Sequence, residues 1–583
     1  MRKCFNRLLR IDLPTSPNRY EEIPDQLLRR TLGGEGLGAH LLTSRYPRGV
    51  DPLAPENVFI VAAGPTTGTR IWSRSRFAVL SKSPATGGYG ESYCGGSLAP
   101  KIKACGVDAL LISGRCGCLS FLEVSEEGAR YHEAEKLTGR ETFEAEEALP
   151  ERSKAGAGAM VIGPAGENLA RLACIKSDRW RSLGRGGMGA VLRAKNLKGI
   201  AFAGSREAQI HDEPALREIV REIAREARDA PAAEVYQKYG TPNQVRVTNA
   251  ACCFPTRYWS SGYSEHWERL SAAYMHDHFE VKRHGCLTRF LQCTKQSRVK
   301  SGRPEGLVLD GPEFETIYAF GGLNCIDSLE EVAYLNDLCD RLGLDTMSAG
   351  NLSAFTIEAH KREKVDFPLD YNQPDRVADL LRLVAAREGI GELLGEGTAR
   401  AAAALGLEEM VVHVKGLEPA VFDPPVLKGM GLSYATVARG DGHLRGTFYR
   451  AELSGEIEHD RVDNKAVLFA DYEDRAALFD CLFLCRFYRD FVGWDRLAGV
   501  LRGPTRIDLS RPELELIANR ITQATREYNR REGFGPEHDT LLPTLLETRN
   551  DEGAALARRE LATMIDQYNR IWNVRDAETE TRR

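Results

Sequence analysis

The first third of the chain alternates short apolar runs with glycine and proline. Examples are the runs at 56–65, 76–84 and 106–114, which read ENVFIVAAGP, RFAVLSKSP and GVDALLISG. Apolar runs of this length that end at Gly or Pro are typical of buried strands. The pattern therefore predicts a largely β domain at the N-terminal end of the chain.

The pattern becomes helical after a polar linker at 204–214. Asp212 stands where a helix N-cap belongs, with Pro214 in the first turn of the amphipathic run ALREIVREIAREA. Much further along, Ser510 and Glu513 match a capping box ahead of LELIANRITQATREYN. These signals predict that the chain beyond the linker is mainly α-helical.

A second, softer boundary falls near 406–416, where MVVHVKGLE interrupts the helical pattern. We therefore predict an α+β fold with a largely β N-terminal domain followed by two mainly α-helical domains. The predicted boundaries are 1–207, 208–410 and 411–583.

The composition is that of an ordinary globular protein. The chain has 583 residues, 42% hydrophobic and 28% charged, with a formal net charge of -5. These values exclude a disordered chain and give no electrostatic basis for nucleic-acid binding. The start, MRKCFNRLLRIDLP, lacks the apolar core of a signal peptide, and no window approaches a membrane-spanning length. We expect a cytoplasmic protein whose 14 cysteines are thiols or ligands.

Glycines gather at 33–38, 87–90, 95–96 and 184–189. The last cluster, GRGGMG, matches the dinucleotide fingerprint, but the polar SDRWRSL before it cannot be the buried strand that a Rossmann unit requires. Glycine beside arginine suits a phosphate-bearing cofactor, because backbone N–H groups and guanidinium groups both bind anions. Turn glycines and surface arginines are the alternative. The arginines concerned are Arg70, Arg74, Arg76, Arg179, Arg181 and Arg185.

Several sequence blocks follow one another in a specific order. They include GGEGLG (33–38), DPLAPEN (51–57), GPTTGT (64–69), IGPAGEN (162–168) and GRGGMGA (184–190), and then PTRYWSSG, DRLGLD, HVKGLE and YATVARG. Together they are similar to the aldehyde:ferredoxin oxidoreductase family over nearly the whole chain. The resemblance implies a tungsten- or molybdenum-bispterin enzyme, in a family that usually carries a [4Fe–4S] cluster beside the metal.

Two segments, DRLGLD from Asp340 and DCLFLC from Asp480, match the family segments that hold one pterin each. The resemblance assigns Asp340, Asp345 and Asp480 to pterin contacts, and an ionised carboxylate is a good acceptor for the N–H groups of a pterin edge. A helix end capped by Gly343 with solvated acids is the alternative. The remaining cofactor-binding residues that the resemblance implies are Arg76, Gly95, Gly96, Arg185, Gly187 and Leu344.

The resemblance also implies an iron–sulfur site with an altered ligand set. The family draws three cysteines from a C-x2-C-x3-C run and a fourth from the end of the second paired segment, because cluster irons prefer thiolate ligands. Here Cys286, Cys293 and Cys485 are the matching metal ligands, and Arg289 stands at the middle cysteine position. Arginine has no lone pair to give and cannot replace that ligand.

Three outcomes stay open for this iron–sulfur site. It could hold a three-iron cluster, a four-iron cluster with a different fourth ligand, or no cluster, with Arg289 filling the space. Candidates for a different ligand are Cys253, Cys481 and His284. The surrounding basic residues suit an anion as well as a cluster.

Glu315 and His443 match the active-site pair of the family. Oxidising an aldehyde to an acid adds an oxygen from water and removes two electrons and two protons, so a proton acceptor and a hydrogen-bond donor are needed beside the metal. A solvated glutamate and a core histidine are the alternatives. Tyr93 occupies a position where relatives carry a small amide near a magnesium ion, and both retention and loss of that ion are compatible with the sequence.

The favoured hypothesis is a tungsten- or molybdenum-bispterin oxidoreductase with an altered or absent iron–sulfur cluster. Its substrate would be an aldehyde or a related carbonyl or carboxylate compound. The alternative is a catalytically divergent pterin-binding paralogue that serves as a partner subunit or cofactor carrier. A redox partner protein and an oligomer are compatible with both, but the segment EEVAYLND lacks the histidine of the metal site that bridges some family dimers. No nucleic acid or membrane partner is expected.

Overall fold

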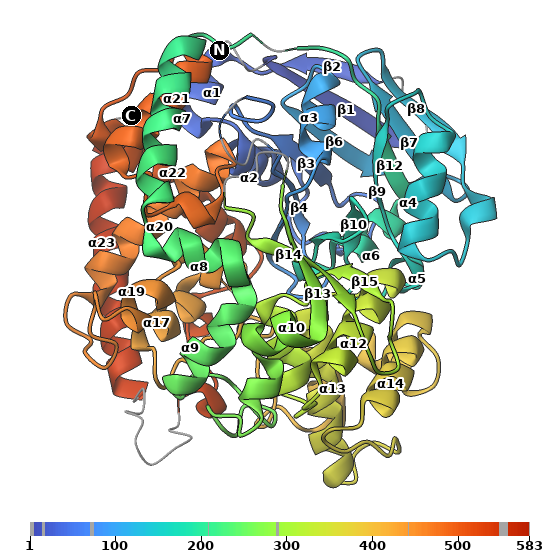
Figure 1. Cartoon of the computed structure of the whole chain (residues 1–583). Helices are drawn as coiled ribbons and strands as arrows, with labels where there is room; N and C mark the ends of the chain where they lie inside the picture. The colour runs from blue at the N-terminus through green and yellow to red at the C-terminus, as the bar shows by residue number, and fades with distance from the viewer. Residues whose placement is uncertain are drawn as a thin grey trace.

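The computed structural model describes residues 5–13, 18–69, 71, 75–207, 209–286, 291–440, 442–546 and 558–581. The strands of the N-terminal third gather on one side of the molecule, and the helices that follow lie below and beside them (Figure 1). The fold is therefore α+β with a β-rich N-terminal part, as the sequence predicts.

Two six-stranded sheets form the N-terminal part, with strand orders β2-β1-β6-β3-β4-β5 and β11-β10-β9-β12-β7-β8. Each is mixed, because β1 pairs with β6 and β12 with β7 in parallel while the other neighbours are antiparallel. The strands are β1 (Arg7–Leu13), β2 (Arg19–Glu22), β3 (Phe59–Ala63), β4 (Phe77–Lys82), β5 (Tyr89–Cys94), β6 (Ala109–Gly114), β7 (Ser120–Ser125), β8 (Gly128–Glu133), β9 (Gly158–Val161), β10 (Ile175–Ser177), β11 (Arg181–Leu183) and β12 (Leu197–Phe202).

The two sheets share one hydrophobic core. In β3, Phe59 and Val61 contribute to this core together with residues of the second sheet such as Leu122, whereas Ile60 contributes to a separate core on the other face. Successive side chains of a strand point to opposite faces. Both faces of β3 are thus buried, which explains why its sequence is a continuous apolar run.

Two helices cover the outer faces of the sheets. Helix α2 (Gly34–Arg45) packs on the first sheet, and a Cβ at Gly38 would lie only 2.5 Å from the Leu80 side chain. Helix α4 (Thr142–Glu151) packs on the second sheet through Leu149. The glycines of GGEGLG are therefore needed for close packing of α2.

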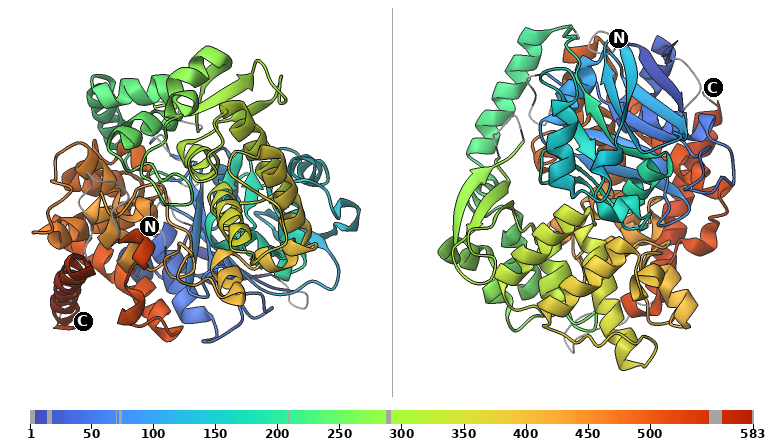
Figure 2. Two further views of the ribbon diagram at one scale, coloured as in Figure 1. Left: turned by 90° about the horizontal axis from the view of Figure 1, so that it is seen from below. Right: turned by 90° about the vertical axis from the view of Figure 1, so that its right-hand side faces the viewer.

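The rest of the chain is mainly helical, with one three-stranded sheet of order β13-β14-β15 (Figure 2). Its strands are β13 (Phe279–His284), β14 (Thr294–Val299) and β15 (Val308–Asp310). The α-helices within the described residues, beyond α2 and α4, are α1 (Asp25–Thr31), α3 (Leu98–Ala104), α5 (Pro164–Glu167), α6 (Met188–Ala194), α7 (Glu213–Arg228), α8 (Pro231–Tyr239), α9 (Gln244–Ala250), α10 (Ala272–His278), α11 (Phe314–Thr316), α12 (Leu329–Leu342), α13 (Thr346–Lys361), α14 (Pro374–Ala386), α15 (Ile390–Leu394), α16 (Thr398–Leu405), α17 (Lys428–Thr436), α18 (His443–Gly446), α19 (Tyr449–Leu453), α20 (Lys465–Leu482), α21 (Trp494–Thr505), α22 (Arg511–Arg531) and α23 (Arg558–Thr581).

Helix α7 packs against the C-terminal part of the chain. Leu216 and Ile219 lie against Gly503 and Gly499 of α21, and Leu216 shares a hydrophobic core with α20 and α22. Figure 1 shows α7 beside these C-terminal helices. The domain boundaries predicted from the sequence remain a prediction. None of the helices that the structure describes has the length and apolar character needed to span a bilayer.

The local signals read from the sequence are confirmed. The Asp212 side chain accepts a hydrogen bond from Ala215 N at 3.0 Å and caps α7. Ser510 and Glu513 form the predicted capping box of α22. The GRGGMG segment follows the short strand β11, which pairs antiparallel with β10, so it does not belong to a Rossmann unit.

Candidate active site

Two helix ends with the same backbone geometry form one part of the candidate site. Gly343 is the C-cap of α12 and Phe483 the C-cap of α20, and both residues adopt the left-handed conformation, with φ of 76° and 55°. Two residues later, Asp345 is the N-cap of α13 and Cys485 the N-cap of the 3-10 turn η6 (Arg486–Tyr488). The similarity of the two sequence segments is therefore also a similarity of structure.

Both helix ends are held by threonines of the N-terminal part. Thr142 Oγ1 donates a hydrogen bond to the Asp340 carbonyl at 2.7 Å, and Thr66 Oγ1 donates to the Leu482 carbonyl. These carbonyls belong to last helical turns, where carbonyl groups lack partners within the helix. A Cβ at Gly34 would overlap the carbonyls at the end of α20, so this glycine allows the two chain segments to approach closely.

Asp340 is buried in an ion pair that the sequence did not reveal. Lys176 Nζ on β10 lies 2.5 Å from Asp340 Oδ1, and Asn336 Nδ2 donates to Oδ2 at 2.9 Å. Burial disfavours the charged ammonium, but the Asp340 carboxylate outweighs it and raises the pKa of Lys176. Because a carboxylate has about four acceptor sites, Asp340 retains capacity for a further donor.

Arg185 and Asp345, which the sequence resemblance assigns to cofactor binding, lie next to each other. Arg185 Nη1 lies 3.2 Å from Asp345 Oδ2, which also accepts a hydrogen bond from Ser348 N at 3.2 Å. The Arg185 guanidinium further donates to the Glu418 carbonyl. Gly187 is the N-cap of α6, with φ of 74°, and a Cβ at this position would collide with the Arg171 carbonyl, so no side chain fits there. Leu344, between Gly343 and Asp345 in the first paired segment, is buried and forms a β-bridge with Ala173, just before β10.

Asp480 lies in a larger buried charge network. Arg486 Nη2 is 2.6 Å from Asp480 Oδ2, and Arg445 Nη1 is 3.9 Å from the same oxygen. Arg445 also pairs with Glu35, with Nη1 2.9 Å from Oε2, and with Glu91, with Nη2 2.5 Å from Oε2. Burial raises the pKa of Glu35 to about 8 against the opposing effect of Arg445, with Glu91 adding to the rise.

The three predicted cluster cysteines line one cavity of about 300 Å³. Cys286 Sγ accepts a hydrogen bond from Gly96 N at 3.4 Å, and Gly95 lies against the same sulfur. Burial, together with the neighbouring thiols Cys485 and Cys286, raises the pKa of Cys293. A cluster is wider than a single ion, so thiols arranged around a cavity fit a cluster better than a mononuclear site.

Among the described residues, no group of three or more His, Cys, Asp or Glu side chains is placed to hold a metal ion, and this includes the three cysteines of the cavity. Cys253, Cys481 and His284 are not among the residues that line the cysteine cavity. His284 instead lies 2.8 Å from the Asp310 carboxylate. Arg289 falls at 287–290, outside the described residues, so its proposed occupation of the cluster space is untested.

Cations border the cysteine cavity. Arg76 Nη1 donates to the Leu484 carbonyl at 3.0 Å, and its guanidinium lies 5.6 Å from the centre of the Tyr93 ring. Arg181 Nη2 lies 3.1 Å from Asp310 Oδ2, and although burial opposes its charge, Cys286 and Asp310 raise the pKa of Arg181. These cations would offset the negative charge of a thiolate-bound group. Tyr93 donates its hydroxyl to Glu91 Oε2 at 2.9 Å, so the structure places it in the charge network.

Glu315 and His443 lie side by side. His443 Nε2 is 3.3 Å from Glu315 Oε1, and both side chains are largely buried, with 11% and 25% of their surface exposed. His443 begins the short helix α18 and Glu315 lies in α11, so the pair connects distant parts of the chain. The ring of Phe422 lies 5.7 Å from that of His443 and stacks on Tyr449 at 3.7 Å. An acid–base pair with an aromatic wall suits proton transfer near a small organic substrate.

The Glu315–His443 pair adjoins both the charge network and the cysteine cavity. Leu444, the residue after His443, lines that cavity, and Arg445, the next residue, joins α18 to α2 and β5. The turn that carries His443 is therefore fixed by a buried arginine. Glu35, Glu91 and Arg445 are far apart in the sequence. Their contact could therefore not be predicted from the spacing of residues along the chain.

Comparison with known proteins places these features in one class, that of the oxidoreductases. Family models of the aldehyde ferredoxin oxidoreductases match residues 8–204 (N-terminal domain) and 218–576 (domains 2 and 3). The tungsten-containing aldehyde ferredoxin oxidoreductase of Pyrococcus furiosus is 32% identical over 97% of this chain and 96% of its own length, and that of Thermococcus kodakarensis is 32% identical over 92% and 91%. The chain belongs to the aldehyde ferredoxin oxidoreductase family and is an oxidoreductase of that type.

Two further similarities are more distant. The WOR-like subunit of an aliphatic sulfonate oxidoreductase from Pyrococcus furiosus is 29% identical over 70% of each chain. The solved active-site complex BamBC of benzoyl coenzyme A reductase, bound to 1,5-dienoyl-CoA, contains a chain with a TM-score of 0.84 at 20% identity, covering 98% of this chain and 94% of that one. At this identity the second similarity shows the fold alone.

Proposed function

We propose that this chain is a tungsten-dependent bispterin oxidoreductase that converts a small aldehyde into its carboxylic acid. The observation that carries this proposal is the Glu315–His443 pair, 3.3 Å apart, beside a cavity lined by three thiols. The names of relatives with near-complete coverage include tungsten and aldehyde. The reaction adds one oxygen atom from water to the aldehyde carbon and releases two electrons and two protons.

The charged residues of the two helix ends fit a bispterin group. Asp340 and Asp345 are fixed by Lys176 and Arg185, and each carboxylate keeps room for further donors. Asp480 is fixed in the same way at the second helix end. These residues would hold the pterin edges, and the bound metal–pterin group would supply the two-electron acceptor.

The acid–base pair would handle the protons of the reaction. Glu315 keeps a quarter of its surface exposed and can accept a proton from the attacking water. His443 can donate a hydrogen bond to the carbonyl oxygen from one ring nitrogen, and at Nε2 it can take over the proton that Glu315 has accepted, across the 3.3 Å contact. The Phe422 and Tyr449 rings limit water access on one side of the histidine.

The same proposal includes an iron–sulfur centre with three cysteine ligands. Cys286, Cys293 and Cys485 border a cavity large enough to take a cluster, and Arg289 replaces the fourth family cysteine in the sequence. An iron left without a thiolate changes the reduction potential of a cluster. Such a centre would alter the route by which electrons leave the enzyme.

Metal analysis combined with one variant tests the proposed function. Anaerobically purified protein is assayed for tungsten, molybdenum and iron, and aldehyde oxidation is followed with a viologen dye as electron acceptor. Glu315→Gln should lower kcat by at least about 100-fold, the usual contribution of a general base, with an unchanged metal content. Glu305→Gln, at an exposed site ten residues before Glu315, is the matched control. A folded protein with neither tungsten nor molybdenum, or a fully active Glu315→Gln, would refute the proposal.

A second function, that of a partner subunit, is favoured by one observation. Two of the similar proteins are parts of larger assemblies according to their names, a WOR-like subunit and the BamBC complex. In that case the isolated chain would hold the metal group but oxidise aldehydes only with its partner. Aldehyde oxidation by the metal-loaded chain alone separates the two functions. Light scattering of the same sample gives the molecular mass and shows that no partner is present.

A further inference from the structure

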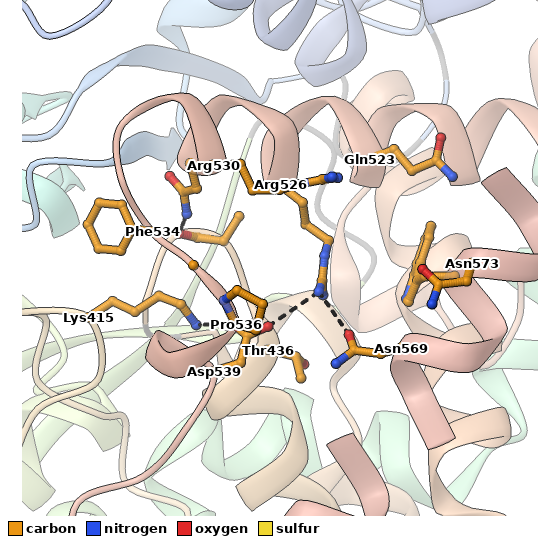
Figure 3. A pocket seen from close by; sticks show the side chains of 14 residues that line it. Lys415, Thr436, Gln523, Arg526, Arg530, Phe534, Pro536, Asp539, Asn569 and Asn573 are labelled. Carbon is orange, nitrogen blue, oxygen red and sulfur yellow. Dashed lines mark hydrogen bonds and ion pairs between the residues drawn. The ribbon is translucent and has the colours of Figure 1, made fainter. Parts of the chain in front are cut away.

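A second cavity lies away from the cysteine cavity, in the C-terminal part of the molecule. It has a volume of about 280 Å³ and is bordered by α22, α23, the C-terminal end of α17, the loop at Lys415 and the 3-10 turn η7 (Pro536–His538) (Figure 3). None of the candidate catalytic, pterin or cluster residues lines it. The active site described above therefore does not account for it.

Positive charge exceeds negative charge among the residues that line this cavity. Lys415 Nζ lies 2.9 Å from Asp539 Oδ1, and Arg526 Nη2 lies 3.3 Å from Asp539 Oδ2. One carboxylate is thus shared by two cations, of which Lys415 is only 4% and Arg526 only 19% exposed. Arg530, also in the lining, adds a third cation near the rim, where Glu527 lies 3.5 Å from it.

Two buried hydrogen-bond donors in the cavity wall lack an acceptor among the described residues. Arg526 Nη2 uses Asn569 Oδ1 at 3.1 Å as a second acceptor. Arg526 Nη1 and Gln523 Nε2 are buried and find no hydrogen-bond acceptor within the described part of the chain. Figure 3 shows the Arg526 side chain extending into the middle of the group of lining residues, between Asp539 and Asn569. Buried donors of this kind are normally satisfied.

We propose that this cavity binds a small oxyanion, a molecule with one carboxylate or phosphate group. Its oxygens would accept hydrogen bonds from the Arg526 guanidinium and the Lys415 ammonium, the two cations that share the Asp539 carboxylate. A water molecule occupies about 30 Å³ of liquid, so the cavity of about 280 Å³ has room for a compact organic anion. Phe534 and Trp572 in the wall can contact the apolar part of such a molecule.

Calorimetric titration of the full-length, metal-analysed protein tests this site. The probes are sodium phosphate and sodium acetate, with sodium chloride at equal ionic strength as the reference. We expect saturable binding of at least one of the two oxyanions, and the better probe identifies phosphate or carboxylate as the preferred group. Because binding is read out directly, the result is independent of aldehyde oxidation and of the proposed function.

Three variants separate the site from general charge effects. Arg526→Gln should weaken binding by at least about tenfold, because a charge-assisted bidentate contact is lost. Gln523→Glu introduces a carboxylate one helical turn before Arg526 on α22. This carboxylate would occupy the Arg526 guanidinium, so the variant should stay folded and no longer bind the anion. Arg511→Gln removes the same charge from the exposed start of α22 and should leave binding unchanged.

The proposal would be overturned by either of two results. One is the absence of saturable binding of phosphate and acetate to the unaltered protein. The other is a Gln523→Glu variant that unfolds at the same temperature as the unaltered protein and binds the anion equally well.

Discussion

The helix ends at Gly343 and Phe483 share a backbone turn and differ in the residues that hold it. At the first, a glycine takes the left-handed conformation, Asp340 faces a single cation, Lys176, and the next helix begins at Asp345. At the second, Phe483 takes that conformation, and the following turn begins at Cys485. The two ends therefore keep the same turn, held by hydrogen bonds, but carry different side chains at the same place. That side chain is a carboxylate, Asp345, at the first end and a thiol, Cys485, at the second.

The largest effect should come from the residue that follows each turn. Under the proposed function, Cys485→Ser should remove iron from the protein and leave tungsten in place, because the thiol borders the cysteine cavity. Asp345→Asn should instead reduce the tungsten content, because Asp345 lies with Arg185 on the opposite turn. Elemental analysis of both variants measures the difference. Cys481→Ser, a buried thiol outside the cavity, is the control and should retain iron.

The next effect concerns the cations that face the two aspartates. Lys176→Met should lower the free energy of unfolding by about 3–5 kcal/mol, because Asp340 is left as an uncompensated buried charge. Arg486→Met should lower it by only about 1–3 kcal/mol, since Arg445 remains 3.9 Å from Asp480. Urea unfolding followed by circular dichroism compares the two. Equal losses would show that Arg445 does not support Asp480.

A smaller effect tests whether the left-handed residue is strained at both turns. At positions 343 and 483, the protein with glycine should have a free energy of unfolding about 1–2 kcal/mol higher than the protein with alanine, because a Cβ is unfavourable at positive φ. The comparison is therefore Gly343→Ala against the unaltered protein, and Phe483→Ala against Phe483→Gly, each by thermal unfolding. At 343 the Cβ would also lie 3.0 Å from Gly163 N. Equal stabilities of the two 483 variants would contradict a shared strain.

The smallest effect concerns the threonines that bond to the two helix ends. Thr142→Val and Thr66→Val keep the side-chain shape and remove one hydrogen bond each. Each should lower the free energy of unfolding by about 1 kcal/mol, the usual net value of one hydrogen bond. Thermal unfolding at matched protein concentration measures both. A loss confined to one of them would show that the N-terminal part supports the two turns unequally.

The sequence predicted the features that depend on local order. Apolar runs located β3, β4 and β6, and the side chains of Asp212, Ser510 and Glu513 marked helix starts. These elements follow from alternation, capping and turn chemistry, which act over a few residues. The polar residues before GRGGMG also correctly excluded a dinucleotide-binding unit.

The partners of the buried charges could not be predicted in this way. Lys176 lies in a short strand, IKS, and nothing in that strand indicates that it faces Asp340, 164 residues away. The same holds for Arg445 and Glu35, which come together only through packing of α18 against α2 and α20. Burial of a charge depends on the whole tertiary structure, so spacing along the chain carries no signal for it.

Arg445 also has a consequence for how this protein is made. It is 410 residues from Glu35 and 354 from Glu91, so its buried contacts close very long loops of chain. During synthesis the N-terminal sheets can form early, since domains fold as units from the N-terminal end. The turn that carries His443 can take its final position only after some three-quarters of the polypeptide has been translated. A chain that terminates before this point would expose Glu35 and Glu91 without their counter-charge, a feature by which quality control could distinguish unfinished from finished molecules.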